Sequence, residues 1–359
     1  MSIVDKYVPY DTQFVRKREL VFLNCLAIIV HVLDGTLGTL LVATSHDVKF
    51  PVVASLVEYV TGQPGGSFFR TMPNTWFSVS AFWPSIAVEW ITAAFHGVYL
   101  LALINPFVDD AIRKYVANTS SINALRWVEY GVTATLMTTV GSLAIGISDA
   151  YYFVRNLACG VALQACGYVL ELLDPDMAGE RRVANAVWYI AFVLNSSAVV
   201  VLLYQTFASK THANLWLFVE NSVPFALWFN TFGVVAWMAF TRHNQFVDRY
   251  FAERWYVILS LSTKFAVFWL SFGTYRKIAE TEGYVQKTGV HWDAVRYMAM
   301  TLPAAWVLAY WVYDVRVWNA LIKEERTRNA SKSARRPTSD SATLARKRRP
   351  VQNSSVVYV

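Results

Sequence analysis

The stretch from Trp255 to Tyr275 places the strongest constraint on the fold. Its sequence, WYVILSLSTKFAVFWLSFGTY, is 21 residues long, which is enough for one helix to cross a bilayer. It contains one charged residue, Lys264, close to its middle. A charge at that depth costs about 3 kcal/mol or more. The lysine therefore needs a partner or a chemical use.

The composition is that of an integral membrane protein. Of the 359 residues, 55% are hydrophobic and only 16% are charged, against about 25% in soluble proteins. The net charge is +7, but residues 321–359 alone hold ten Lys/Arg against three acids. The basic character therefore belongs to the tail, and we expect no nucleic-acid partner. No His pair has i, i+4 spacing and no Cys/His cluster occurs, so we expect no metal site. We also do not expect an enzyme.

Apolar segments of helical length recur along the chain and predict transmembrane helices. Basic residues gather before residue 20 and after residue 320, so the positive-inside rule places both termini in the cytoplasm. An even number of spans satisfies this, although the last outside loop is also basic. We expect a multi-pass protein of the host plasma membrane. The eight predicted spans are 20–44, 83–106, 122–146, 148–172, 184–208, 216–241, 254–275 and 297–318.

The segments outside the spans have distinct characters. The first outside loop, about 45–82, contains FPVVASLVEYV, then GQPGG, then SFF, a pattern typical of a short β-hairpin that also suits a dimer contact. The Ser/Thr/Arg-rich tail, 321–359, is predicted to be disordered, either as a lipid-binding basic segment or as a plain solvated tail. The expected organisation is a cytoplasmic tail over 1–19, a bundle over 20–276, a loop and an extra helix over 277–320, and the basic tail.

Three interpretations of Lys264 compete. A lysine near a helix end reaches the interface along its own stem, but here each end is about 15 Å away. A buried ion pair with a structural role is the second. The third is chemical, because a lysine amine forms a Schiff base with carbonyl compounds, and in a membrane the evident carbonyl compound is retinal. Ser260 lies one turn earlier on the same face.

A protonated Schiff base is a buried charge and requires a counter-charge. Arg126-Trp127-Val128-Glu129-Tyr130 opens the third span, and Glu129 is the one acid well inside it. Helix rise brings Glu129 and Lys264 to within about 5 Å of the same depth. Glu129 is therefore the predicted counterion. The alternative is a pair between Glu129 and Arg126 near the interface.

Further ionisable and aromatic residues fall inside the spans. Intramembrane ionisable groups suggest a polar cavity or a proton relay, although each alone also suits a structural role. Flat rings suit a slot for a long polyene, and equally suit ordinary packing. The predicted proton path comprises His31, Asp34, Glu89, His96 and Glu220, and the predicted ring set comprises Phe225, Trp228, Phe229 and Phe232.

The lysine with Ser260 one turn earlier, together with R-W-x-E-Y, resembles the heliorhodopsins over roughly residues 15–276. The resemblance implies an all-α, seven-helix bundle with an inverted topology, a cytoplasmic N-terminus, strands in the first loop and a homodimer. It implies all-trans retinal linked to Lys264, with Glu129 as counterion and His31 and His96 in a cavity. Ser260 replaces the aspartate of ordinary pumps, which argues against a standard outward proton pump.

The chain departs from the family in its extra span and in Asp34 and Glu89. It resembles members from giant viruses of marine algae, some of which are said to move protons. We therefore expect a photoreceptor with light-activated passive proton transport, an ion-channel activity. A non-transporting sensor that signals to a partner through a slow photocycle is the alternative. A lysine-dependent transporter is a third reading, for which no inverted repeat is visible.

Overall fold

The structure is a computed structural model that describes residues 10–43, 49–63, 66–80, 82–105, 123–144, 149–208, 228–247, 249–281, 283, 287 and 289–334. The chain divides into two compact units, Met1–Val307 and Leu308–Val359. The first unit holds a bundle of helices and a β-hairpin, and the boundary between the units falls inside the last helix.

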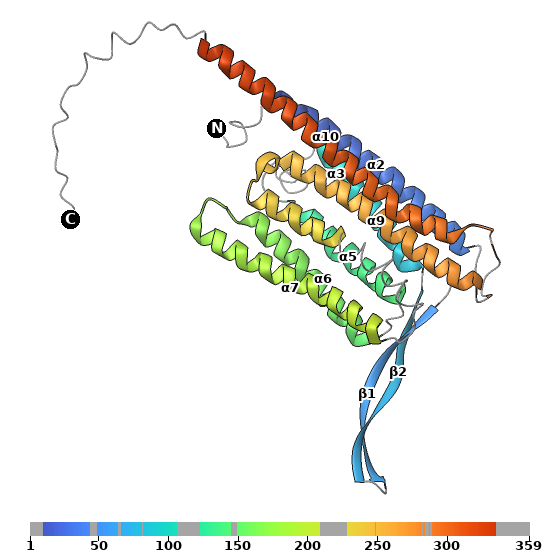
Figure 1. Cartoon of the computed structure of the whole chain (residues 1–359). Coiled ribbons are helices and arrows are strands. Elements are labelled where there is room, and N and C mark those ends of the chain that lie inside the picture. Colours follow the sequence, from blue (N-terminus) through green and yellow to red (C-terminus); the bar gives the residue numbers. More distant parts are fainter. Residues whose placement is uncertain are drawn as a thin grey trace, which may run out of the picture. The chain divides into compact units, whose positions relative to one another are not determined.

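Long helices make up the first unit (Figure 1). Four helices in the described ranges are long and apolar enough to cross a membrane: Arg18–Ala43, Trp83–Ile104, Ala150–Leu172 and Tyr250–Thr281. The chain is therefore a multi-pass membrane protein. The helices are α2 (Tyr10–Ala43), α3 (Trp83–Ile104), α5 (Ala124–Ala144), α6 (Ala150–Leu172), α7 (Ala178–Ala208), Trp228–Phe240, α9 (Arg249–Thr281) and the start of α10 (Trp292–Ala334).

The predicted spans coincide with these helices to different degrees. The ends of α3, α5 and α6 lie within two residues of those predicted. α2 begins at Tyr10 and α9 ends at Thr281, so both continue past the apolar segments that predicted them. Of the predicted span 216–241, the structure describes the part from 228 onward. Hydropathy locates the apolar part of a helix, whereas the helical hydrogen bonding continues into the polar flanks.

Local sequence explains several helix starts. Ser80 Oγ accepts from the backbone N–H groups of Phe82 and Trp83, both at 3.1 Å, and Pro84 occupies the first turn of α3. Asp149 caps α6 by accepting from the Tyr152 N–H at 2.8 Å. Such caps satisfy N–H groups that the helix itself leaves free.

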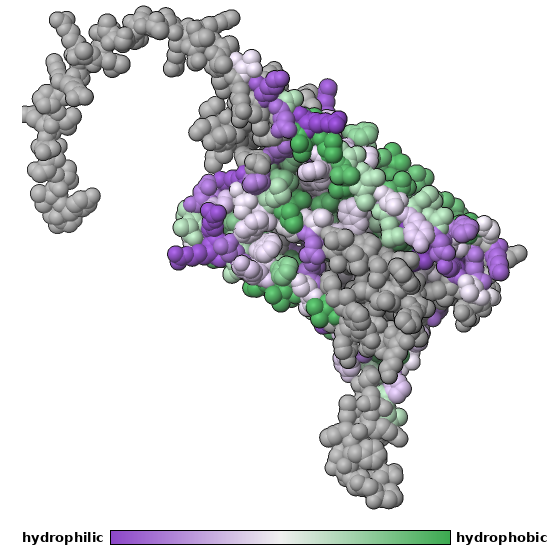
Figure 2. All heavy atoms as spheres, in the orientation of Figure 1, coloured by the Kyte–Doolittle hydropathy of each residue, from purple (hydrophilic) through white to green (hydrophobic). Residues whose placement is uncertain are grey.

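The core of the bundle is built around α9. Of its most apolar window, 89% is buried, against 17% for α6. α9 contacts α2, α3 and α5, while α6 and α7 pack beyond α5. Trp237 and Phe240 pack with Leu170 and Trp188 of α6 and α7, and so attach the helix Trp228–Phe240 to that side. On the face shown in Figure 2, apolar side chains lie over the middle of the helices and hydrophilic ones gather toward the helix ends.

The predicted hairpin is present and is longer than expected. β1 (Lys49–Gln63) pairs antiparallel with β2 (Gly66–Ser80), and Lys49 lies opposite Ser80 at the base. Val52 and Ala54 are buried against Ala150 of α6, and Val53 forms a bridge with Asp149. The base of the hairpin is thus attached to the start of α6, and the strands extend away from the helix ends (Figure 1).

α10 follows α9 and continues into the second unit. Its first residue, Trp292, packs against Phe272 of α9 with ring centroids 6.3 Å apart. The hydrogen bond from Lys277, at 2.8 Å, lowers the pKa of Asp293 below its ordinary value.

In the second unit the helix continues from Leu308 to Ala334, so the tail predicted from 321 begins inside a helix. The segment 321–334 is rich in Lys, Glu, Arg and Ala, which are strong helix formers. The rest of the tail lies outside the described residues. α10 is not among the four helices suited to a membrane span, so the span at 297–318 stays a prediction.

Candidate functional site

Lys264 of α9 and Glu129 of α5 form an ion pair in the middle of the bundle. Lys264 Nζ donates to Glu129 Oε1, and the two residues are 3% and 1% exposed. The Tyr130 ring lies 5.3 Å from Lys264 Nζ, where a ring face adds favourable electrostatics. Each charge is paired, which makes burial tolerable.

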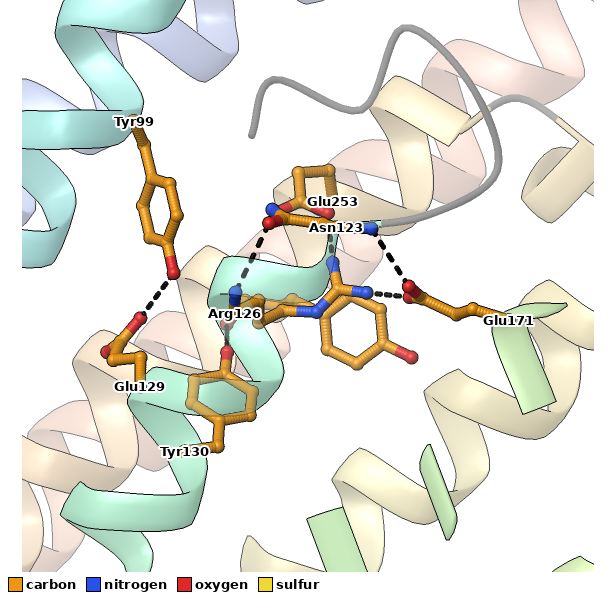
Figure 3. A network of polar contacts seen from close by, with 8 residues as sticks. Tyr99, Asn123, Arg126, Glu129, Tyr130, Glu171 and Glu253 are labelled. Atoms are coloured by element: carbon orange, nitrogen blue, oxygen red, sulfur yellow. Dashed lines mark hydrogen bonds and ion pairs between the residues drawn. The ribbon is translucent and has the colours of Figure 1, made fainter. Parts of the chain in front are cut away.

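Arg126 does not pair with Glu129, so the alternative considered for that acid is wrong. Its guanidinium instead pairs with Glu253 of α9 and Glu171 of α6 and lies over the Tyr256 ring at 3.8 Å. Asn123 completes the cluster, because its side chain donates to Glu253 at 2.7 Å. Figure 3 shows Arg126 directed toward the two carboxylates and Glu129 turned toward Tyr99. The carboxylates on neighbouring helices satisfy the arginine, and Glu129 remains available to Lys264.

Tyr99 of α3 makes the second contact of the Glu129 carboxylate. The hydroxyl donates to Glu129 Oε2 at 2.9 Å (Figure 3). The same ring meets the His96 ring edge-on, with centroids 5.7 Å apart. Tyr99 thus lies between the ion pair and a histidine.

His31 and His96 stack in the interior between α2 and α3. Their ring centroids are 5.8 Å apart and their planes differ by 11°. His31 Nδ1 lies 2.5 Å from Glu89 Oε2, and His96 Nδ1 lies 2.8 Å from Asn24 Oδ1. Both histidines and Glu89 are at most 2% exposed. Three residues predicted for the proton path therefore form one buried cluster.

The remaining predicted acids differ in their placement. Asp34 is 4% exposed and accepts from the Trp269 indole N–H at 3.0 Å. Glu220 lies outside the described residues. No group of three or more His, Cys, Asp or Glu suited to a metal ion occurs in the described part of the chain.

A cavity of about 270 Å³ opens beside Lys264, just below the roughly 300–1,000 Å³ usual for ligand pockets. Its wall is mostly apolar and aromatic, with Ser260 and Lys264 on the α9 side. Of the predicted rings, Phe229 and Phe232 line it, Trp228 is not part of its wall, and Phe225 lies outside the described residues. The other rings of the wall are Trp127, Tyr130, Trp188 and Phe192.

Sequence reasoning missed several residues of this site. Asn24 and Tyr99 carry no charge, and single polar or aromatic residues inside apolar helices are too common to select. A weak signal existed for Tyr99, because it follows His96 by three residues and so shares its helix face. Trp188 and Phe192 lie on α7, far along the chain from Lys264, and their convergence depends on the packing of the helices.

Comparison with known proteins assigns the chain to a family. The heliorhodopsin family model matches residues 20–275, which is most of the chain and includes Glu129 and Lys264. No curated protein matches the chain.

Proposed function

Because the chain belongs to the heliorhodopsin family, a family of retinal-binding light-sensing rhodopsins, we propose that Lys264 carries the retinal, in its all-trans form, and that Glu129 is the counterion. The cavity supports this assignment. It is mostly apolar, walled by flat rings, and has Lys264 in its lining. Bound retinal supplies the absorption of visible light and a change of shape that follows absorption. The chain supplies a wall that excludes water and a carboxylate that balances the positive charge at Nζ.

We further propose that the protein moves protons passively across the membrane when illuminated. The observation that carries this proposal is the row of buried ionisable groups on one side of Lys264. Glu129 meets Lys264, His96 stacks on His31, and His31 contacts Glu89. Proton transfer needs groups at hydrogen-bond or single-water spacing. Light would move the Nζ proton to Glu129, and the histidine cluster would carry it on toward Glu89 and Asp34.

A non-transporting sensor is the second candidate, and a different observation favours it. On the other side of Glu129, Arg126 is held by two carboxylates and by the Tyr256 ring. An arginine does not give up its proton in proteins, so Arg126 and its two carboxylates form a fixed ion cluster rather than a proton relay. In this case the light-driven change would end in a rearrangement near α5, α6 and α9 that a partner reads.

Photocurrent recording in voltage-clamped cells distinguishes the two. A passive proton path predicts a light-dependent current whose reversal potential follows the proton gradient and ignores Na⁺, K⁺ and Cl⁻. A driving force of 100 mV acts with about 2.3 kcal/mol per proton, so the current should change sign as voltage is swept. Glu89→Gln should reduce it, whereas Glu180→Gln, at an acid near the exposed start of α7, should not. If cells with coloured protein at the plasma membrane show no light-dependent current, the sensor is favoured.

A further inference from the structure

Tyr99 occupies a position that neither the resemblance nor the proposed proton path uses. It lies in α3 and is 6% exposed. Its hydroxyl donates to Glu129 Oε2 at 2.9 Å, and its ring packs edge-on against His96. Figure 3 shows the hydroxyl directed at the carboxylate. Tyr99 is therefore in contact with both the counterion of the proposed function and the histidine cluster.

The two oxygens of Glu129 have different partners. Oε1 accepts from Lys264 Nζ and Oε2 accepts from Tyr99. A donor on one oxygen of a carboxylate draws negative charge toward itself and fixes the rotation of the group. The Tyr99 hydroxyl thus sets both the direction in which Oε1 faces Lys264 and the negative charge that Lys264 meets.

His96 completes the connection. Its Nδ1 is occupied by Asn24, whereas its Nε2 is buried and has no hydrogen-bond partner among the described residues. A tyrosine hydroxyl both donates and accepts, so it can take a proton at its oxygen while it gives up its own.

We propose that Tyr99 is the residue that positions Glu129 on Lys264 and links it to His96, an inference that rests on the proposed function. In the transfer, Glu129 receives the Nζ proton at Oε1, and the neutral carboxyl group rotates to turn that proton toward Tyr99. The proton then passes to Tyr99 Oη while the original Oη–H proton passes to His96 Nε2, directly or through one water. The net result is one proton moved from Glu129 to His96, no electrons are exchanged, and the tyrosine ends neutral as it began.

A purely structural hydroxyl is the competing explanation, because a buried tyrosine usually finds a hydrogen-bond partner wherever it lies. The two explanations differ in what removal of the hydroxyl does to Glu129. A structural hydroxyl contributes stability alone. A positioning hydroxyl also changes the charge and vibrations of the carboxylate, and a linking hydroxyl changes proton transfer as well.

The test compares Tyr99→Phe with a matched variant, Tyr275→Phe. Tyr275 is also buried, and its hydroxyl donates to the Val140 carbonyl at 2.8 Å, away from Glu129. Both variants lose one buried hydroxyl and keep the ring. In retinal-free protein, infrared difference spectra against Glu129→Gln identify the Glu129 carboxylate band. We expect Tyr99→Phe to shift this band and Tyr275→Phe to leave it in place.

The pigment provides two further readouts. Loss of the Tyr99 hydroxyl concentrates negative charge on the carboxylate and stabilises the positive charge at Nζ. Tyr99→Phe should therefore absorb at shorter wavelength, opposite in sign to the shift expected for Glu129→Gln. Since a positioned proton-transfer group typically contributes about 10²–10⁴-fold in rate, the photocurrent per pigment should fall at least about tenfold. Tyr275→Phe should match wild type in both.

The outcomes separate this inference from the function on which it rests. If wild-type pigment carries no current, transport is wrong, and the infrared and absorption shifts still decide whether Tyr99 positions Glu129. An unshifted band and unshifted absorption in Tyr99→Phe overturn the positioning role. A full current in Tyr99→Phe, with wild type conducting, overturns the link to His96 even if the spectra move.

Discussion

At the scale of single residues, two buried clusters of the described bundle set charges against charges of the opposite sign. Lys264 meets Glu129, and Arg126 meets Glu253 and Glu171. Removing one member of such a pair strands the other in a medium that solvates it poorly. We therefore expect a substitution at one of these residues to act mainly through the lost charge pair and less through the change in side-chain volume.

Lys264→Ala removes the amine to which retinal is proposed to attach. We expect purified protein incubated with all-trans retinal to stay colourless, because no other lysine of the described residues lines the cavity. Lys277→Ala is the control, since Lys277 lies at the exposed end of α9 and pairs with Asp293. The measurement is the visible absorption band. A coloured Lys264→Ala protein would refute the assignment.

Glu129→Gln keeps the shape of the side chain and removes its charge. Without the carboxylate, the positive charge at Nζ loses its counter-charge. The pigment should therefore absorb at longer wavelength and lose its visible band at lower pH than wild type. Spectra recorded through a pH titration test this, with Glu180→Gln as the control. An unchanged spectrum and titration would mean that another group is the counterion.

Arg126→Leu should destabilise the bundle strongly. It leaves Glu253 and Glu171 without the cation that both contact, a loss of about 3–5 kcal/mol for a broken buried pair. Arg242→Leu removes a half-exposed arginine that pairs with Asp174 and Asp176, and should cost about 0–1 kcal/mol. Thermal loss of the visible band measures both. If both variants lost the visible band at the same temperature, burial of the Arg126 cluster would not contribute to stability.

Two residues of the site could be predicted because each stands out within its own segment of the sequence. Lys264 is the one charge of its apolar segment, and Glu129 is the one acid well inside its own. In the structure these two residues form an ion pair. Tyr99 and the two partners of Arg126 could not be predicted in this way. Their roles arise from helices distant in sequence, and a tyrosine or a glutamate at a helix end has many possible partners.

At the scale of elements, α2, α3 and α9 approach closely at one glycine. A Cβ at Gly38 of α2 would lie 2.9 Å from Phe268 Cζ of α9 and 3.0 Å from Ile86 Cγ1 of α3. Small residues let membrane helices pack tightly. Gly38 therefore marks the point where the helix carrying His31 is held against the helix carrying Lys264.

Gly38→Val should push these helices apart. Overpacking of this kind typically costs about 1–3 kcal/mol. Gly97→Val on α3 is a matched control, because a Cβ there meets nothing within 4 Å and the helix-propensity change is the same. Comparing the temperatures at which the two pigments lose colour isolates the packing effect. The prediction fails if Gly97→Val is as unstable as Gly38→Val.

Elements differ in how well sequence predicts them. The starts of α3 and α6 have local causes, Ser80 with Pro84 and Asp149, and the predicted starts lay within two residues of them. The hairpin was predicted from its turn and its β-rich strands. Its length depends on register over fifteen residues in each strand, and no local signal marks where pairing stops.

At the scale of the whole molecule, topology remains a prediction that depends on α10. Basic residues at both ends of the chain place both termini in the cytoplasm if 297–318 spans the membrane. Epitope tags at residue 1 and at residue 359 should then both be hidden in intact cells and accessible after permeabilisation. An exposed C-terminal tag with a hidden N-terminal tag would show that α10 does not cross.

The burial of α9 also has a consequence for biosynthesis. Three of the helices that contact it, α2, α3 and α5, precede it in the chain and leave the ribosome first. α9 brings Glu253, Arg254 and Lys264 into the membrane, and these groups are poorly tolerated in bare lipid. α9 must therefore insert against helices that already carry Glu129 and Glu19, the partners of Lys264 and Arg254. If retinal attaches to Lys264 as proposed, the nascent chain acquires the ability to become coloured late in translation, when α9 is inserted.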